Sequence, residues 1–475
     1  RALLDQAAAD VKDPETGVSV RDRSLANLGV RGAEPAASED DKKRGKAAAS
    51  GVLPIGDLGS GSDYTPFVQH LGLASINLGT NQGLWYAQAG ASLHRSDSFR
   101  LSSDFVPTAT EDGGRRNNAE RRDSKVSLKV GLTPGNGDEY AISYQRQDGR
   151  KGQPPSTVPA DARYWKWPYW DKESLYFLSN TGLGDRERLQ VRLYHDTYGN
   201  EVDSYTDATY STLKTSGRGS VGTGRSIYDD KSIGGSVQLE SVRLPAQTIR
   251  LVTQYKRDDH KETDANATVN STYKDAFLSF GAEDSIRMGD RLSLSLGVSR
   301  HQLRPRTVFS RGNPYSLPGR KSATDAQAGL FFDWSDDTRL YATVARKTRL
   351  PTLKDRYSQR LGTFIENPGL RPENSVNYEL GYQGRIGGDF RAEAAVFYSD
   401  IEDRIQTVTN VSGSLSQMQN VGKVRAAGVE IHAHVVEARR RQQFVAARVT
   451  LAVGESVSTP AGLKAAAEST SAPNV

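Results

Sequence analysis

The chain has 475 residues, with 36% hydrophobic and 25% charged residues, no cysteine and a formal net charge of +5. This composition excludes disulfide frameworks and thiolate metal sites, and no apolar run reaches the roughly 18 residues that a membrane-spanning helix needs. Because basic residues are spread among acidic ones along the chain, solvated loops are favoured over a nucleic-acid-binding surface. A membrane β-barrel is not excluded, since only alternate residues of its strands face lipid.

Residues 1–62 differ in character from the rest of the chain. They are rich in Ala, Gly, Asp and Arg, and they include the charged run Glu39–Arg44. Little in this stretch can build a core, so we predict loop or partly disordered chain here. The chain opens at Arg1 without a signal peptide, which indicates either that the peptide has been removed or that the chain is a fragment.

From about residue 67 onward, segments of about ten residues alternate apolar and polar side chains, as barrel strands do. The clearest is residues 291–300, where Leu and Val at even positions alternate with Ser and Gly. A period of two predicts strands with one apolar face. The opposite face carries Ser, Gly, Gln, Arg and Glu, which is typical of a wet lumen and not of a sandwich core.

The connections between these segments are of two kinds. Tight turns rich in Gly, Asp and Asn are predicted at residues 79–83, 134–138, 182–186, 288–290, 335–337 and 387–389. Long loops are predicted at residues 96–124, 148–172, 198–230, 258–272, 302–322, 348–372 and 402–418. Strict alternation of short and long connections is typical of an up-and-down barrel with turns at one rim and loops at the other.

We therefore predict an all-β protein, an antiparallel up-and-down transmembrane β-barrel over residues 63–453. About sixteen strands run from about Phe67 to about Val453, and a seventeenth is predicted near residue 51. Residues 454–475, rich in Ala, Ser and Thr, are predicted to form a disordered tail.

Four segments in the second half carry a family resemblance. They read LYATVARKTRLPTLKDRYS at 340–358, NPGLRPENSVNYELGYQG at 367–384, AAVFYSDIEDRIQ at 394–406 and NVGKVRAAGVE at 420–430. This succession resembles the TonB-dependent outer-membrane receptors, and the Asn-Pro-x-Leu-x-Pro-Glu run followed by Gly-Val-Glu is quite specific to them. The strand pattern supports the resemblance over residues 64–438.

The resemblance implies a barrel of about 22 strands in the bacterial outer membrane, plugged by an N-terminal domain. It implies energy-dependent import of a scarce nutrient, a ferric siderophore or cobalamin, with a TonB-type energy-transducing complex as partner. Outer-membrane lipid and lipopolysaccharide are further expected partners, and we expect a monomer. An iron chelate would be cargo, so no resident cofactor is predicted.

The chain departs from the family pattern at both ends. Only Gly17–Val20 and Leu28–Gly32 resemble plug segments, so residues 1–62 are interpreted as a plug remnant, and about five C-terminal strands of the expected barrel are not found. Truncation at both ends leaves two alternatives to a receptor open. One is a passive, porin-like barrel without a plug, and the other is a non-functional barrel fragment.

Two glutamates are predicted to face the lumen. In 377–383 the residues on either side of Glu379 are apolar and face lipid, and the same holds around Glu430, so both carboxylates point inward. The resemblance implies that they pair with plug arginines, one of them matching Arg31. The alternative is that both merely line wet lumen.

An aromatic run lies in the predicted loop from Gln147 to Lys172. The candidate ligand-binding residues there are Tyr164, Trp165, Trp167, Tyr169 and Trp170, and they include three of the five tryptophans of the chain. With nearby Lys and Arg they suit a catecholate or hydroxamate iron chelate, through stacking and charge. The alternative is an aromatic girdle at the membrane interface.

Arg115 and Arg116 belong to a basic cluster in the loop 96–124 and are the remaining candidates for an anionic ligand or for lipopolysaccharide phosphates. A solvated loop is the alternative. The chain carries no nucleophile elbow, phosphate-binding Gly-rich loop or zinc-protease motif, so we predict neither an enzyme nor a metal site.

Overall fold

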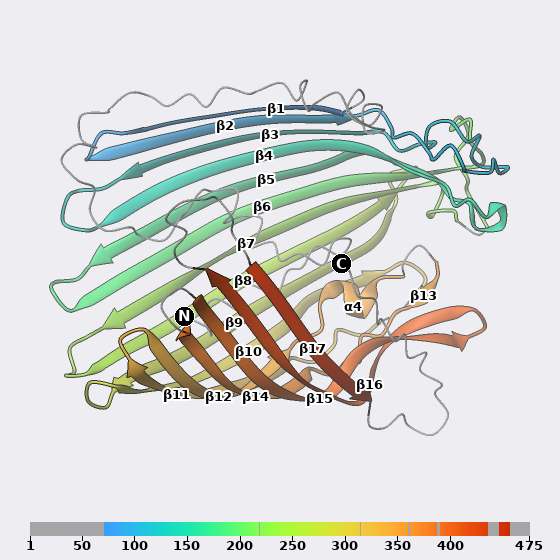
Figure 1. Ribbon diagram of the computed structural model, residues 1–475. Coiled ribbons are helices and arrows are strands. Elements are labelled where there is room, and N and C mark those ends of the chain that lie inside the picture. Colours follow the sequence, from blue (N-terminus) through green and yellow to red (C-terminus); the bar gives the residue numbers. More distant parts are fainter. Residues whose placement is uncertain are drawn as a thin grey trace.

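The computed structural model describes residues 71–217, 219–313, 315–359, 362–386, 390–435 and 446–456. These residues form one 17-stranded sheet, curved into a tall wall with short turns at one end and larger connections at the other (Figure 1). The predicted strand near residue 51, the plug remnant at 1–62 and the end of the chain from residue 457 lie outside the described residues.

Most strands are long. Their bounds are β1 Leu71–Asn81, β2 Trp85–Ser96, β3 Arg121–Leu132, β4 Glu139–Gln153, β5 Tyr164–Gly182, β6 Glu187–Tyr205, β7 Arg225–Ser241, β8 Gln247–Asp264, β9 Val269–Arg287, β10 Leu292–Ser310, β11 Lys321–Ser335, β12 Thr338–Arg349, β13 Phe364–Ile365, β14 Glu373–Ile386, β15 Phe390–Ser412, β16 Leu415–Val435 and β17 Ala446–Ser456. Two short helices, the 3-10 helix η2 Pro159–Asp161 and α4 Leu353–Tyr357, lie in the connections. In the described part of the chain, no helix has the length and hydropathy to cross a membrane.

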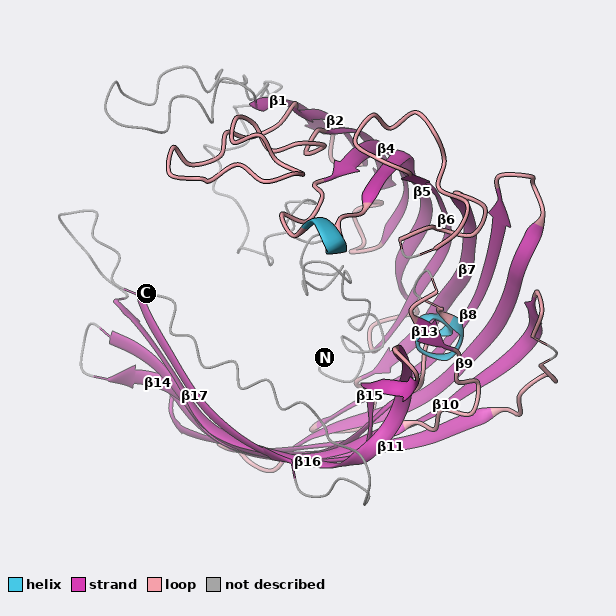
Figure 2. Ribbon diagram, turned by 90° about the vertical axis from the view of Figure 1, so that its right-hand side faces the viewer, coloured by secondary structure: helices cyan, strands magenta, loops and turns pink. Residues whose placement is uncertain are grey.

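Each long strand pairs antiparallel with the next one along the chain, from β1 to β17, and β12 pairs with β14 past the two-residue β13. Setting β13 apart leaves sixteen long strands, which confirms the predicted up-and-down topology and strand number. Among the described residues no pairing joins β1 to β17, so in cross-section the described sheet is an open curve (Figure 2).

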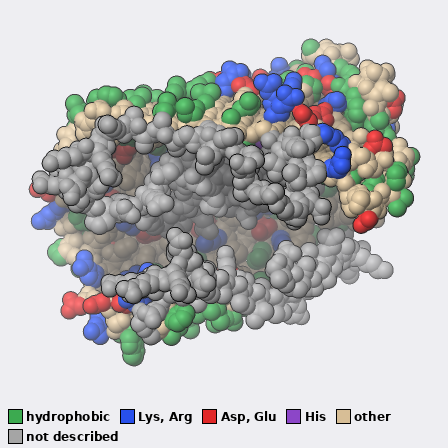
Figure 3. Space-filling model, turned by 45° about the horizontal axis from the view of Figure 1, so that its top comes forward, with side chains coloured by type: hydrophobic (Ala, Val, Ile, Leu, Met, Phe, Trp, Pro, Cys, Tyr) green, Lys and Arg blue, Asp and Glu red, His purple; other side chains and the backbone are tan. Residues whose placement is uncertain are grey.

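Alternation along the strands separates two faces. On β10, Leu296 and Val298 are 43% and 50% exposed, whereas Ser299, which points to the opposite face, is only 6% exposed. Tyr273 and Asp275 share the second face on β9, and α4, which contacts them, lies inside the curve (Figure 2). The polar face is therefore the concave inner face. The apolar face covers much of the outside of the wall (Figure 3).

The predicted long connections at 258–272 and 402–418 are wrong. Strand β8 extends to Asp264 and β9 begins at Val269, while only residues 413 and 414 separate β15 from β16. Both segments contain charged residues, and several of these pair between or within strands. Asp259 on β8 pairs with Arg257 at 2.6 Å, and Glu402 on β15 pairs with Lys423 on β16 at 3.1 Å. Polar sequence therefore did not mark the end of a strand.

Candidate functional site

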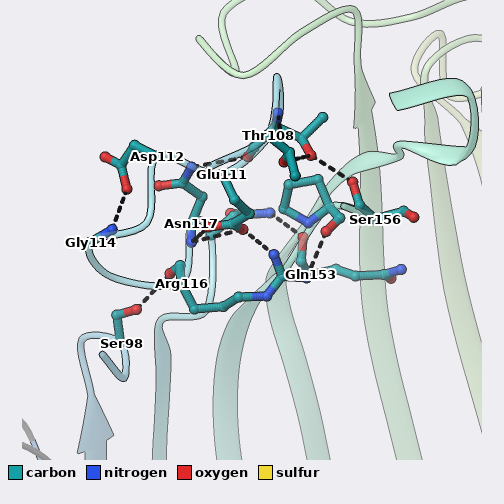
Figure 4. Close-up of polar contacts among 12 residues, drawn as sticks. Ser98, Thr108, Glu111, Asp112, Gly114, Arg116, Asn117, Gln153 and Ser156 are labelled. Atoms are coloured by element: carbon teal, nitrogen blue, oxygen red, sulfur yellow. Dashed lines mark hydrogen bonds and ion pairs between the residues drawn. The ribbon is translucent and has the colours of Figure 1, made fainter. Parts of the chain in front are cut away.

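The loop between β2 and β3 is folded around a buried ion pair (Figure 4). Glu111, whose side chain is fully buried, binds the guanidinium of Arg116, and it also accepts hydrogen bonds from the backbone N–H of Asn117 at 3.1 and 3.2 Å. Arg116 also donates to the carbonyl of Pro155 at 2.6 Å. The structure thus places Arg116 as a link between two loops.

Arg115, the other predicted basic residue, is exposed and forms a β-bridge with Arg100 in the same loop. A cavity of about 500 Å³ lies where this loop meets the segment after β4. Arg116 and Arg163 contribute basic groups to its wall, together with Gln153, Ser156 and Asp161.

The aromatic run does not lie in a loop, which corrects the predicted boundaries 147–172. Tyr164–Trp170 opens strand β5, and the connection from β4 covers only residues 154–163. The pairing of these strands shifts register between Gln147 and Lys151 and between Lys166 and Tyr169. Such bulges break the period of two, which is why the sequence pattern did not indicate strands here.

Trp165 is the centre of a small hydrophobic core at the loop end of the wall. It is 6% exposed and packs with Val202 of β6 and Val221 of the β6–β7 connection. Its indole Nε1 donates to the carbonyl of Gly219 at 2.8 Å. These contacts hold the β6–β7 connection against β5, so the role of Trp165 is structural.

Trp167 and Trp170 surround a cation. The Nζ atom of Lys151 lies 4.9 Å from the ring centre of Trp167 and 4.3 Å from that of Trp170. Strand β5 is regularly paired from Tyr169 onward, so Trp170 lies on the same face as the buried Ser174 and on the face opposite to the exposed Leu175. This is the inner face. Two half-buried indoles and an ammonium group thus meet on the inside of the rim, where they can bind a flat anionic ligand.

The two tyrosines of the run have different surroundings. Tyr169 shares the outer face with Leu175, where an aromatic girdle would lie. Tyr164 packs edge-on against Tyr210 of the β6–β7 connection, with ring centres 6.0 Å apart.

Glu379 and Glu430 both lie on the inner face, between exposed outer-face residues of their strands. The hydroxyl of Tyr341 donates to Glu379 at 2.6 Å, and strand registers place Glu393 and Glu430 on the same face of the neighbouring strands. Three carboxylates thus face one part of the lumen across β14, β15 and β16. This is an arrangement that a cationic partner would neutralise. Arg31, the predicted partner, lies outside the described residues.

Gly381 has a specific packing role in this patch. It stands opposite Tyr341 in the ladder, and a Cβ atom at this position would lie 2.2 Å from the tyrosine ring. Any side chain would displace the ring that carries the hydroxyl to Glu379. The same arrangement recurs at β2 and β3, where the ring of Tyr86 covers Gly131 and its hydroxyl donates to Glu139.

Sequence reasoning missed a segment that folds into the lumen. Residues 350–359 and 362–372, here called the inner segment, lie between β12 and β14 and carry α4 and β13 inside the curve of the wall (Figure 2). Arg356 of α4 is fully buried and pairs with Asp275 of β9, while Tyr357 stacks on Tyr273 with ring centres 4.3 Å apart. The segment is therefore attached to the inner wall through a buried charge pair and an aromatic stack.

A second attachment centres on Glu366 of the inner segment. Its carboxylate accepts hydrogen bonds from Gln359 at 2.9 Å and from Ser310 of β10 at 3.1 Å. The two-residue β13 pairs parallel with Ser416–Gln417 of β16. The sequence carries one signal for this fold, because Thr352 and Asp355 form the reciprocal hydrogen bonds of a capping box and so mark the start of a helix.

Comparison with known proteins identifies the chain's relatives. Residues 59–460 match the family model described as TonB dependent receptor-like, beta-barrel. A curated relative, the heme/hemopexin utilization protein C of Haemophilus influenzae (strain 86-028NP), is 30% identical over 127 residues, which is 21% of this chain and 18% of that protein.

Solved structures agree in fold. The chain is similar to the copper transporter OprC, with a TM-score of 0.63, 16% identity, and coverage of 82% of this chain and 62% of that one. It is also similar to the FrpB iron transporter from Neisseria meningitidis (F5-1 variant), with a TM-score of 0.63, 14% identity, and coverage of 84% and 65%. The chain thus spans less than two thirds of the length of these transporters. It belongs to the TonB-dependent receptor-like β-barrel family.

Proposed function

We propose that this chain forms the barrel wall of a bacterial outer-membrane receptor for energy-dependent, TonB-linked uptake of a scarce nutrient, and that the nutrient is a ferric siderophore. The family match and the apolar outer face support a place in the outer membrane, among its lipids and lipopolysaccharide. In this orientation the end with the larger connections faces outward, where a ligand arrives.

The observation that carries the ligand assignment is the cluster of Lys151, Trp167 and Trp170. Ferric catecholates and hydroxamates present flat ligand arms around an iron centre, and the catecholate complexes carry negative charge. Indole rings can stack on such arms, while the ammonium group compensates the charge. Because the cluster faces inward at the loop end, a ligand bound there would stand at the entrance of the lumen.

The carboxylates of Glu379 and Glu430 support a second part of the proposal. An inward-facing acidic patch without cations would repel itself in a plugged, poorly hydrated lumen. We assign to these two glutamates the binding of basic plug residues, with Arg31 as one candidate. In a receptor that carries its plug, Glu379→Gln should make the plug unfold at lower urea concentration, and an unchanged urea midpoint would contradict this role.

Heme is a second candidate ligand. The curated relative over 127 residues is a heme/hemopexin utilization protein, and an indole-lined cluster also suits a porphyrin ring. Both candidates place an iron compound at the same aromatic cluster, so they differ in the ligand and agree on the site.

A binding experiment separates the candidates. The full chain, folded in detergent, is titrated with a ferric catecholate, a ferric hydroxamate and hemin, and bound iron is measured after ultrafiltration. We expect one of the two siderophore classes to bind, and Trp167→Ala/Trp170→Ala to weaken that binding by about tenfold or more.

The matched control is Trp334→Ala, because Trp334 is an exposed tryptophan near the turn end of β11. Its loss should leave binding unchanged. Selective hemin binding that the double variant abolishes would favour heme. Iron-chelate binding that neither variant alters would remove the ligand site from the proposal.

A further inference from the structure

We propose that Lys125 of β3 and Lys172 of β5 form an anion-binding subsite on the inner face, next to the cluster of Lys151, Trp167 and Trp170. This subsite selects iron chelates with a net negative charge, of the catecholate type, over neutral ones. The inference rests on the proposed function. It narrows the class of ligand and adds two residues that the aromatic cluster does not include.

The strand registers bring the two lysines to the same level of the wall. Lys125 lies opposite Gln147 of β4, and Gln147 lies opposite Lys172. Neighbouring strands are about 4.8 Å apart, so the Cα atoms of the two lysines are about 10 Å apart. Lysine side chains are long and flexible, and both ammonium groups can therefore reach one anion that lies over Gln147.

Both side chains belong to the inner face. Val126 on β3 and Leu175 on β5 are 46% and 49% exposed on the outer face. Lys125 precedes Val126 by one residue and Lys172 precedes Leu175 by three, and the pairing of both strands is regular over these stretches. Alternation therefore turns the two lysines inward, where both are half-buried.

The charges of the two lysines are not compensated by the protein. Within the described residues neither lysine forms an ion pair, and the inner-face carboxylates of the adjacent rows have other partners. Asp123 of β3 pairs with Arg121 and with His94, and Asp196 of β6 accepts a hydrogen bond from the hydroxyl of Tyr176 at 3.0 Å. The pair of ammonium groups is thus available to an anion that enters the lumen.

The side chains around the lysines are neutral hydrogen-bonding groups. On the inner face the neighbours in register or one step away are Ser92, Ser127, Gln145, Gln147, Ser174 and Tyr198. They can donate to the oxygens of a ligand without adding negative charge. Farther along the sheet the inner face carries Asp230, Asp258 and Asp275 instead. An anion that enters at the loop end is therefore attracted to β3–β5.

The position of the pair links it to the aromatic cluster. Trp170 precedes Lys172 by two residues on the same face of β5, which places it about 7 Å from Lys172 along the strand, toward the loop end. The Nζ atom of Lys151 lies 4.3 Å from the ring centre of Trp170. A chelate whose flat arm stacks on this indole can thus present its charge to both lysines at once.

Charge separates the two siderophore classes. A ferric tris-catecholate is a trianion, whereas a ferric tris-hydroxamate is neutral at its iron centre. Two half-buried ammonium groups attract the trianion, and this attraction is screened less than it would be on an open surface. The same groups gain little from a neutral chelate. The subsite therefore favours the catecholate class.

The test compares two double variants of the full chain folded in detergent. Lys125→Gln/Lys172→Gln removes the subsite. The matched control Arg192→Gln/Lys321→Gln removes two basic residues of the inner face that lie opposite uncharged residues on other strands. Each protein is titrated with a ferric tris-catecholate and a ferric tris-hydroxamate, and bound iron is measured after ultrafiltration.

We expect the unmodified chain to prefer the tris-catecholate, and Lys125→Gln/Lys172→Gln to bind it about tenfold more weakly, with the control unchanged. Added salt should weaken this binding more in the unmodified chain than in the variant. Lys125→Arg/Lys172→Arg keeps both charges and should keep the affinity, which separates loss of charge from misfolding.

The outcomes distinguish this inference from the proposed function. Equal tris-catecholate binding by the unmodified chain and Lys125→Gln/Lys172→Gln, or a preference of the unmodified chain for the tris-hydroxamate, would overturn the subsite alone. Absence of binding of any iron chelate, or binding that Trp167→Ala/Trp170→Ala leaves unaltered, would contradict the proposed ligand site and the subsite together.

Discussion

Two groups of connections in the described part of the chain are stabilised in different ways. The loops at the rim over β2–β7 pack on one another, around Trp165 and the pair Glu111–Arg116. The inner segment packs instead on the wall, through Arg356, Tyr357 and Glu366. The rim loops can thus hold their shape through several mutual contacts, whereas the inner segment is held by its contacts with β9, β10 and β16 of the wall.

The largest difference should come from Asp275→Ala. Arg356 is fully buried, so removing its partner leaves a charge that cannot reach water, at a cost of about 3–5 kcal/mol. We expect the inner segment to detach while the rim loops stay folded, and hydrogen exchange of residues 353–359 measures this. Asp259→Ala is the control, because it breaks ion pairs with Arg257 and Lys274, whose side chains remain accessible to water. Equal protection in both variants would refute the dependence on Asp275.

Trp165→Ala should produce the reverse pattern. Removing a buried tryptophan from the small core lowers the free energy of unfolding by about 3–4 kcal/mol, and it removes the donor to the carbonyl of Gly219. The connection between β6 and β7 should become sensitive to proteases, and the inner segment should remain protected. Loss of protection in both regions would show that they are coupled.

Glu111→Ala should have a smaller effect confined to the β2–β3 loop. Arg116 keeps some access to water, so losing the carboxylate costs about 1.5–3 kcal/mol. Protease cleavage within residues 97–120 reports the change. Asp112→Ala is the matched control, because Asp112 is exposed and only accepts a turn hydrogen bond from Gly114. A control that is cleaved as fast as the variant would argue against the buried pair.

The smallest effect is expected at the opposite end of the wall. The backbone N–H of Gly182 donates to Asp138 at 2.7 Å and holds the pKa of that turn carboxyl below its usual value. A carboxyl group with a lowered pKa stabilises the folded state at pH values above its ordinary pKa. This contribution is lost as the pH falls through the lowered pKa. Asp138→Asn should therefore be slightly less stable to urea than the unmodified chain at neutral pH and equal to it in strong acid. A difference that does not change with pH would exclude the charge as its cause.

The sequence predicted the wall well, and it predicted the inner segment only as a long connection at residues 348–372, without its inward fold. Alternation places a residue on a face wherever pairing is regular, so Glu379 and Glu430 could be placed on the inner face from their neighbours. It fails at the bulges around Lys151 and Lys166, and it carries no information about which loop turns inward. The pairing of Arg356 with Asp275 joins residues 81 positions apart, and no local pattern reports such a contact.

The two-residue turn between β15 and β16 has a consequence for what the cell surface presents. Strand β15 has 23 residues, which is about 78 Å of extended chain, far more than a membrane of about 25 Å apolar thickness requires even at a steep tilt. The excess forms a two-stranded arm of β15 and β16 that extends at the loop end (Figure 1). In the proposed orientation, Gly413 at its tip is among the first points that an antibody, a phage or a neighbouring cell would meet, and it is a natural position for an inserted epitope tag.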